Sequence, residues 1–111
     1  FLRKRDISYI IAGEQSLDYA LALEKLKILF GIETLMLGGG AVLNWSFIQA
    51  GMCDEVSIVI APAADGSTET QSLFMAKDGL SSDTPVSFTL LEAKPMGGSS
   101  VWLRYKVNFN K

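Results

Sequence analysis

The sequence predicts one α/β domain, and three observations lead to that prediction. Two short apolar runs each precede a segment with helical spacing, so the first half of the chain reads strand, helix, strand, helix. A third run, residues 54–61, is apolar on both faces apart from Ser57, and two alternating runs follow near the C-terminus. We therefore expect a three-layer mixed sheet with flanking helices, closed by a C-terminal antiparallel hairpin.

The first strand and helix are expected within residues 7–30. Residues 7–12, ISYIIA, predict a buried strand because β-branched and aromatic residues dominate the run. Residues 17–30 predict a helix, with Ser16 as its N-terminal cap and Gly31 in the C-terminal position that favours glycine. Apolar residues at helical spacing give this helix one face to bury.

The second strand and helix are followed by a strand expected at the centre of the sheet. Residues 34–37, TLML, predict a short strand, and a helix from about residue 41 to 50 ends at Gly51. Residues 54–61, DEVSIVIA, predict a central, buried strand. Pro62 ends it, because proline has no N–H for the hydrogen-bond ladder.

The C-terminal part predicts a polar loop and then a hairpin. Residues 73–75, LFM, are the expected anchor of a loop that is otherwise rich in Gly, Ser, Asp and Thr. Residues 86–93 and 101–109 predict two antiparallel strands joined by the turn KPMGGSS. The last strand alternates, which predicts one buried face and one wet face. The expected buried face holds Val101, Leu103, Tyr105, Val107 and Phe109.

The composition excludes several classes of function. Ten basic against twelve acidic residues leave no basic footprint for nucleic acid. No apolar run approaches the length of a membrane span, so we expect a cytoplasmic protein. The chain has no histidine, which removes Ser-His-Asp catalysis and most zinc sites, and we expect no metal. The single cysteine, Cys53, is expected to be a packed thiol rather than a nucleophile.

Three consecutive glycines, Gly38, Gly39 and Gly40, stand between the second expected strand and the helix that begins near Ala41. The N-terminus of a helix presents unpaired N–H groups and about half a positive charge, and glycine lets a phosphate come close to them. The pattern is not a P-loop, because no Lys-Ser or Lys-Thr pair follows. From the pattern alone, a phosphate site and a tight turn that packs helix on strand remain equally open.

The residues around the glycines resemble a known family. Residues 31–66, GIETLMLGGGAVLNWSFIQAGMCDEVSIVIAPAADG, look like the reductase domain of the bacterial bifunctional deaminase-reductase of riboflavin biosynthesis, which has the dihydrofolate-reductase-like fold. The similarity extends more loosely from Ile7 to Val107. The shared features are the glycine run, Leu43-Asn44, Phe47, Ala50-Gly51, Asp54-Glu55, and AP followed by Asp65-Gly66.

The resemblance implies an NADPH-dependent reductase. Gly38, Gly39, Gly40 and Ala41 would hold a cofactor phosphate, while no catalytic residue is identified in this chain. The family reaction is hydride transfer to C1′ of the ribosyl imine of the small-molecule pyrimidine 5-amino-6-(5-phosphoribosylamino)uracil. Such chemistry depends on positioning more than on a strong protein acid or base, so the lack of histidine is compatible with it.

Two departures from the family keep other functions open. Gly38 stands where many members have a glutamate, which leaves room for a dihydrofolate-reductase-like enzyme acting on another pterin or pyrimidine. Residues 1–111 correspond to the C-terminal portion of the reductase domain, so we expect the isolated segment to be inactive.

Open strand edges predict a homodimer. A non-catalytic nucleotide-binding or assembly module is the alternative from a different class.

Four further polar or aromatic sites carry expectations of their own. Asp54 and Glu55 are neighbours on a strand, so their side chains point to opposite faces and a structural role is expected. Asn44 is a poor helix former, and we expect its amide to bind the backbone of a neighbouring loop. Trp45 is expected in the core, and Asp65 is expected near the site, where it suits a sugar hydroxyl.

Overall fold

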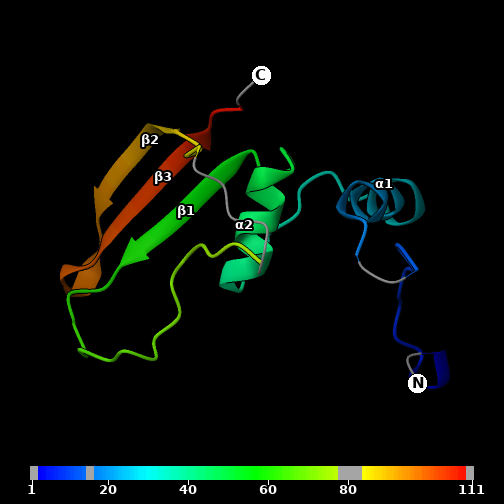
Figure 1. The fold of residues 1–111 in the computed structure, drawn as a ribbon, viewed down its shortest axis with the longest axis horizontal. Coiled ribbons are helices and arrows are strands. Elements are labelled where there is room, and N and C mark those ends of the chain that lie inside the picture. The colour runs from blue at the N-terminus through cyan, green and yellow to red at the C-terminus, as the bar shows by residue number, and fades with distance from the viewer. Residues whose placement is uncertain (1–2, 15–16, 78–83, 110–111) are drawn as a thin grey trace. The chain divides into compact units, whose positions relative to one another are not determined.

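The computed structural model describes residues 3–14, 17–77 and 84–109 (Figure 1). The chain forms two compact units, Phe1–Leu37 and Gly38–Lys111. Within the described residues, no helix is both long and apolar enough to cross a membrane.

The first unit contains a short 3-10 turn, η1 (Arg3–Arg5), and the helix α1 (Tyr19–Phe30). The cap of α1 is Asp18, whose Oδ1 accepts a hydrogen bond from the Leu21 N–H at 3.0 Å. The predicted start at residue 17 is therefore wrong, and the predicted cap, Ser16, lies outside the described residues. The C-terminal prediction is confirmed, because Gly31 has φ 67° and its N–H binds carbonyls of the last turn.

The two strands predicted in this unit, residues 7–12 and 34–37, are not formed. A strand requires a neighbour to complete its hydrogen bonds, and neither run is paired in the sheet of the described strands. The expectation of burial fails as well, since Ile11 is 68% and Met36 92% exposed in this structure. The carbonyls of Ile11 and Ala12 instead accept hydrogen bonds from the Lys25 ammonium and the Asp18 N–H.

The second unit holds the remaining elements. The predicted helix is confirmed as α2, which ends just before the left-handed Gly51 at φ 73°. The predicted hairpin is confirmed as two antiparallel strands joined by a 3-10 turn. The bounds are α2 (Ala41–Gln49), β1 (Glu55–Ile60), β2 (Phe88–Pro95), η2 (Gly97–Ser99) and β3 (Val101–Val107).

The sheet has the order β1-β3-β2, and both of its pairings are antiparallel (Figure 1). The α/β class is confirmed, but the described strands make an antiparallel rather than a mixed sheet, because the two strands expected in the first unit are not part of it. The prediction that residues 54–61 form the central strand is wrong. Of the described strands, β3 pairs on both sides, which leaves β1 at an edge of this sheet with Val59 59% exposed.

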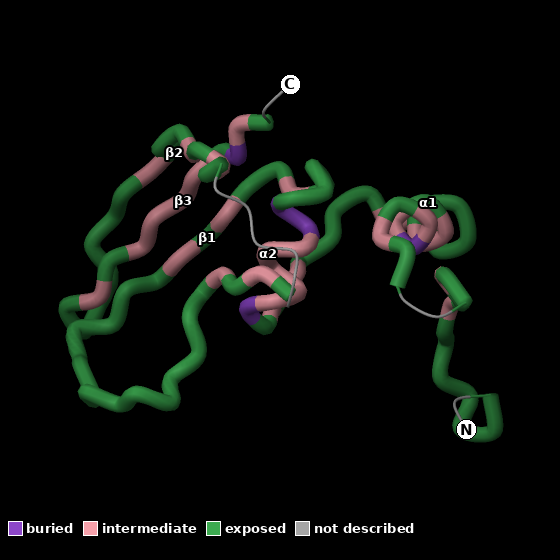
Figure 2. The backbone as a smooth tube through the Cα atoms, viewed as in Figure 1, coloured by how far each residue is buried: buried purple, intermediate pink, exposed green. Residues whose placement is uncertain are grey.

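The alternation predicted for β3 is confirmed only in part: Val107 is buried and Leu103 and Tyr105 are half-buried, whereas Val101 is 38% exposed and Phe109, beyond the end of the strand, is 48% exposed. Opposite Val56 and Ile58 of β1 stand Tyr105 and Leu103, so apolar residues share one face. The other face is polar, with the Arg104 guanidinium 2.8 Å from a carboxylate oxygen of Glu55 and 3.6 Å from one of Glu92. The buried residues of this unit lie on α2 and at the end of β3 (Figure 2). They are Ala41, Phe47, Ile48 and Val107.

Candidate functional site

The glycine turn, residues 38–40, leads directly into α2. Gly40 is the N-terminal cap residue, with φ −82° and ψ −156°, and its carbonyl accepts the first helical hydrogen bond from the Asn44 N–H at 2.8 Å. Gly39 has φ 104°, a conformation that residues with a side chain rarely adopt. The turn itself therefore requires glycine at position 39.

The flanking glycines, Gly38 and Gly40, have no such requirement. Neither has a positive φ, and a Cβ built on either one meets no described atom within 4 Å. Neither a positive φ nor packing within the described chain therefore accounts for glycine at these two positions. A positive φ explains one glycine of the three.

No side chain caps the N-terminus of α2. The contrast is with α1, where the Asp18 carboxylate supplies a cap. The first turn of α2 also holds no acidic residue, so no fixed negative charge opposes an anion there. The N–H groups of Ala41 and the next residues point out of the helix end, as in any first turn, and the glycines keep side chains away from them.

The segment of residues 73–75 is bound to the first turn of α2. The Nδ2 of Asn44 donates to the Leu73 carbonyl at 3.1 Å, and the Met75 N–H donates to the Ala41 carbonyl at 3.2 Å. Both the predicted role of Asn44, an amide that binds a neighbouring loop, and the predicted anchor at residues 73–75 are confirmed. The anchor thus joins the loop to the helix that the glycine turn opens.

The loop that follows β1 contains a hollow of about 470 Å³, lined by residues 63–67 and Thr70. Asp65 shapes this loop, because its carboxylate accepts hydrogen bonds from the Ser67 N–H at 2.9 Å and the Thr70 hydroxyl at 3.3 Å. These contacts give Asp65 a structural role within the loop. Its expected contact with a sugar hydroxyl stays a prediction.

Three other residues with expected structural roles lie at the start of β1. Glu55 pairs with Arg104, and the carbonyl of Asp54 accepts the Val107 N–H at 3.0 Å, so the two acidic residues serve the sheet as expected. Burial raises the pKa of the Cys53 thiol, and the neighbouring charge of Asp54 raises it further. A raised pKa keeps the thiol protonated, which agrees with a packed cysteine. Within the described residues, no group of acidic residues and cysteine could hold a metal ion.

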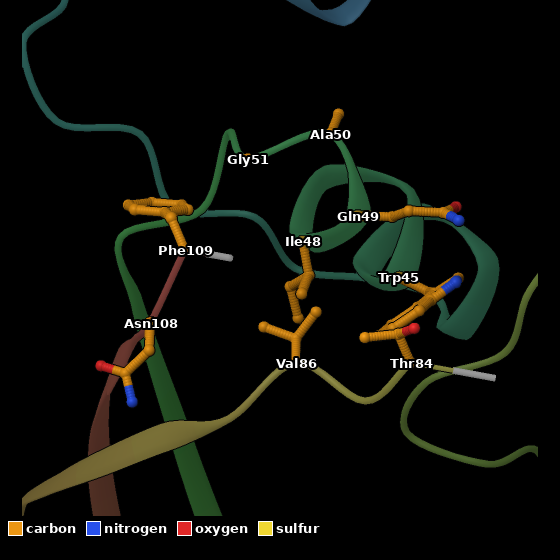
Figure 3. Close-up of a pocket in the computed structure, with 9 residues that line it drawn as sticks. All are labelled: Trp45, Ile48, Gln49, Ala50, Gly51, Thr84, Val86, Asn108 and Phe109. Atoms are coloured by element: carbon orange, nitrogen blue, oxygen red, sulfur yellow. The ribbon is translucent and has the colours of Figure 1, made fainter. Parts of the chain in front are cut away.

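A second cavity, of about 310 Å³, lies at the other end of α2 (Figure 3). In Figure 3, the side chains of Ile48 and Val86 face each other, and Phe109 lies across from Trp45. Trp45 is half-buried and its Nε1 is buried without a hydrogen-bond partner among the described residues. Sequence reasoning missed this cavity, because it joins residues 45–51 to residues 84–86 and 108–109 and no local pattern marks it.

The fold of the chain is that of pyrimidine reductase-like proteins. The chain matches the structure of a pyrimidine reductase-like protein from Corynebacterium diphtheriae with a TM-score of 0.79 and 20% identity, over 98% of this chain and 42% of that one. It matches a structure of RibD from Acinetobacter baumannii with a TM-score of 0.72 and 24% identity, over 97% and 29% of the two chains. These likenesses confirm the fold class.

The family follows from the sequence. The model of the RibD C-terminal domain matches residues 2–101, so the chain belongs to this family, and the predicted resemblance is confirmed. The chain is 40% identical over 93 residues to the 2,5-diamino-6-ribosylamino-4(3H)-pyrimidinone 5′-phosphate reductase of Methanothermobacter thermautotrophicus. It is 31% identical over 64 residues to the enzyme of the same name from Aquifex aeolicus.

The chain spans less than half of these relatives. The first match covers 84% of this chain and 41% of the relative, and the second covers 58% and 28%. The glycine turn, α2 and the anchor at residues 73–75 all lie within the region that the family model matches.

Proposed function

We propose that this chain is part of an NADPH-dependent reductase of the riboflavin pathway, and that residues 38–41 hold a phosphate of the cofactor. Two lines of support meet at the glycine turn. The chain belongs to the RibD C-terminal domain family, and its relatives are named as reductases of a phosphorylated ribosylaminopyrimidine. Reductases of this kind take their hydride from a nucleotide cofactor.

The observation that carries the proposal is the open space at Gly38 and Gly40. Side chains at these positions would meet no described atom, and Gly40 directly precedes the first turn of α2, which no side chain caps. A phosphate oxygen that accepts a hydrogen bond from a backbone N–H sits about 2.9 Å from the nitrogen, a distance at which a nearby Cβ interferes. The residues present therefore fit a bound phosphate.

In this proposal the chain binds and orients the cofactor. The bound NADPH would supply a hydride to the substrate. The backbone N–H groups at the start of α2 would hold a phosphate, with the helix dipole favouring its negative charge. Gly39 sets the direction in which the turn enters the helix, because its φ of 104° is a backbone angle that residues with a side chain rarely adopt. The selection of NADPH over NADH rests on the family resemblance.

The proposed substrate class is a phosphorylated ribosylaminopyrimidine. Two members of this class differ at one ring position: the diaminopyrimidinone in the names of the relatives, and the uracil of the bacterial bifunctional enzyme. The names of the relatives favour the diaminopyrimidinone. A reductase acting on another pterin or pyrimidine remains the alternative, because Gly38 replaces a glutamate that many members carry.

The test uses the complete protein that contains this chain. Cofactor oxidation is followed by absorbance with NADPH and with NADH, each in the presence of the diaminopyrimidinone, the uracil and a dihydropterin. We expect oxidation of NADPH that depends on one of the two ribosylaminopyrimidines. Turnover with the dihydropterin alone would favour the alternative, and tight cofactor binding without turnover of any substrate would favour a non-catalytic module.

A further inference from the structure

Asn44 contacts three parts of the second unit: the start of α2, residues 73–75 and the glycine turn. Its backbone N–H binds the Gly40 carbonyl at 2.8 Å, which starts α2. Its side-chain amide binds the Leu73 carbonyl at 3.1 Å. A Cβ on Gly39 would lie 3.6 Å from the Asn44 Nδ2 and 3.8 Å from its Oδ1, so the amide is also in contact range of the glycine turn.

A second hydrogen bond ties the same two segments together. The Met75 N–H donates to the Ala41 carbonyl at 3.2 Å. Residues 73–75 therefore meet the first turn of α2 at two points, one made by a side chain and one by the backbone. The intervening loop, residues 61–72, is fixed at one end by β1 and at the other by this pair of bonds.

The residue type at position 44 supports a specific role. Asparagine is a weak helix former, because its side chain competes for backbone hydrogen bonds, and here it lies in the first turn of a nine-residue helix. Ser46, on the same helix, bonds only one turn back, with its hydroxyl on the Val42 carbonyl at 2.7 Å. Of these two polar residues on α2, Asn44 makes the bond that reaches another segment.

We propose that Asn44 is a positioning residue, which holds residues 73–75 against the first turn of α2 and thereby fixes the glycine turn for the cofactor phosphate. The inference rests on the proposed function for its ligand. The tether, by which we mean the hold of Asn44 on residues 73–75, is a property of the chain itself. Loss of the Nδ2 donor frees the Leu73 carbonyl and leaves Met75 as the one described backbone bond between the segments. The turn then samples conformations that do not hold a phosphate, and affinity falls.

The test compares Asn44→Ala and Asn44→Leu with wild type in the complete protein. The leucine variant keeps about the size of the side chain, removes its N–H donor and adds no charge beside the phosphate site. The matched control is Ser46→Ala, which removes a side-chain hydrogen bond from the same helix without touching the turn or residues 73–75. For each protein we measure the dissociation constant for NADPH, the midpoint of thermal unfolding, and hydrogen exchange of residues 38–40 and 73–75.

We expect both Asn44 variants to bind NADPH about tenfold more weakly than wild type. Hydrogen exchange at residues 73–75 should be faster in both Asn44 variants. Their midpoints of thermal unfolding should be close to that of Ser46→Ala, and Ser46→Ala should keep wild-type affinity for NADPH. Unchanged affinity in the Asn44 variants would overturn the proposal. If wild type itself binds no NADPH, the proposed function fails, and exchange alone decides: faster exchange at both segments upholds the tether, and unchanged exchange refutes it.

Discussion

Replacement of Gly40 by alanine distinguishes two reasons for glycine at this position: a turn that only glycine can form, and a bound phosphate that leaves no room for a side chain. Gly40 has extended backbone, with φ −82° and ψ −156°, and a Cβ there meets no described atom within 4 Å. Alanine also has fewer conformations than glycine to lose on folding. We therefore expect the free energy of unfolding to stay the same or to rise by about 0.4–1 kcal/mol.

The same substitution should weaken cofactor binding. The new methyl group stands beside the N–H groups at the start of α2, where a bound phosphate oxygen needs close approach. Displacement of that oxygen loses at least one hydrogen bond to a charged group, worth about 1.5–3 kcal/mol. This corresponds to a dissociation constant for NADPH raised by about tenfold to a hundredfold.

The assay is a titration that follows NADPH fluorescence, paired with denaturant unfolding of each variant. Gly97→Ala is the matched control, because a Cβ on Gly97 also meets no described atom and its φ is not positive, yet it lies in the turn between β2 and β3. We expect Gly97→Ala to keep wild-type affinity. Wild-type affinity in Gly40→Ala would refute the phosphate site, and a loss of stability beyond about 1 kcal/mol would support the tight-turn interpretation.

Three further predictions follow from the described residues. Gly39→Ala should lower the free energy of unfolding by about 1–3 kcal/mol, measured with denaturant, because φ 104° strains any side chain; an unchanged value would contradict the turn geometry. The pKa of Cys53 is raised in the folded state. The contribution of the protonated thiol to the free energy of unfolding is therefore complete below the ordinary thiol pKa and is lost as the pH rises toward the raised value. The free energy of unfolding of wild type should therefore fall relative to that of Cys53→Ala as the pH passes the ordinary thiol pKa. Parallel curves of unfolding free energy against pH for the two proteins would count against this. Sedimentation of the complete protein should show a homodimer, because β1 and β2 are edge strands among the described strands, and a monomer at micromolar concentration would oppose that.

Sequence reasoning succeeded where the signal was local. The helix α2, the stop at Gly31 and the C-terminal hairpin each depend on residues that are near neighbours in the chain. Asn44 was also assigned correctly, because an asparagine inside a helix needs a hydrogen-bond partner and a polar loop with an apolar anchor follows β1. The family was identified from a stretch of 36 residues, 31–66, that includes the glycine turn.

Sequence reasoning failed where structure depends on distant partners. Residues 7–12 and 34–37 have the composition of strands, but composition does not supply the neighbouring strand that a ladder needs. The run that forms β1 is apolar on both faces, which indicates a central strand, whereas the pairing of β3 on both sides places β1 at an edge. The cavity beside Trp45 was missed for the same reason.

The structure also divides the three glycines, which the sequence treats alike. Gly39 is required by its own backbone, while Gly38 and Gly40 face open space. The tight-turn interpretation therefore accounts for Gly39, and the phosphate site stays a prediction for Gly38 and Gly40. The family resemblance implies a glutamate at the position of Gly38 in many members, and the open surroundings of Gly38 leave room for a larger side chain.

The most direct test of the phosphate site is an amide chemical-shift titration of the complete protein with NADPH, by nuclear magnetic resonance. We predict that the largest shifts on binding fall on the N–H groups of residues 39–42, at the turn and the start of α2. Shifts confined to the cavity between residues 45–51 and 84–86, with no shift at the turn, would contradict a phosphate site at residues 38–41.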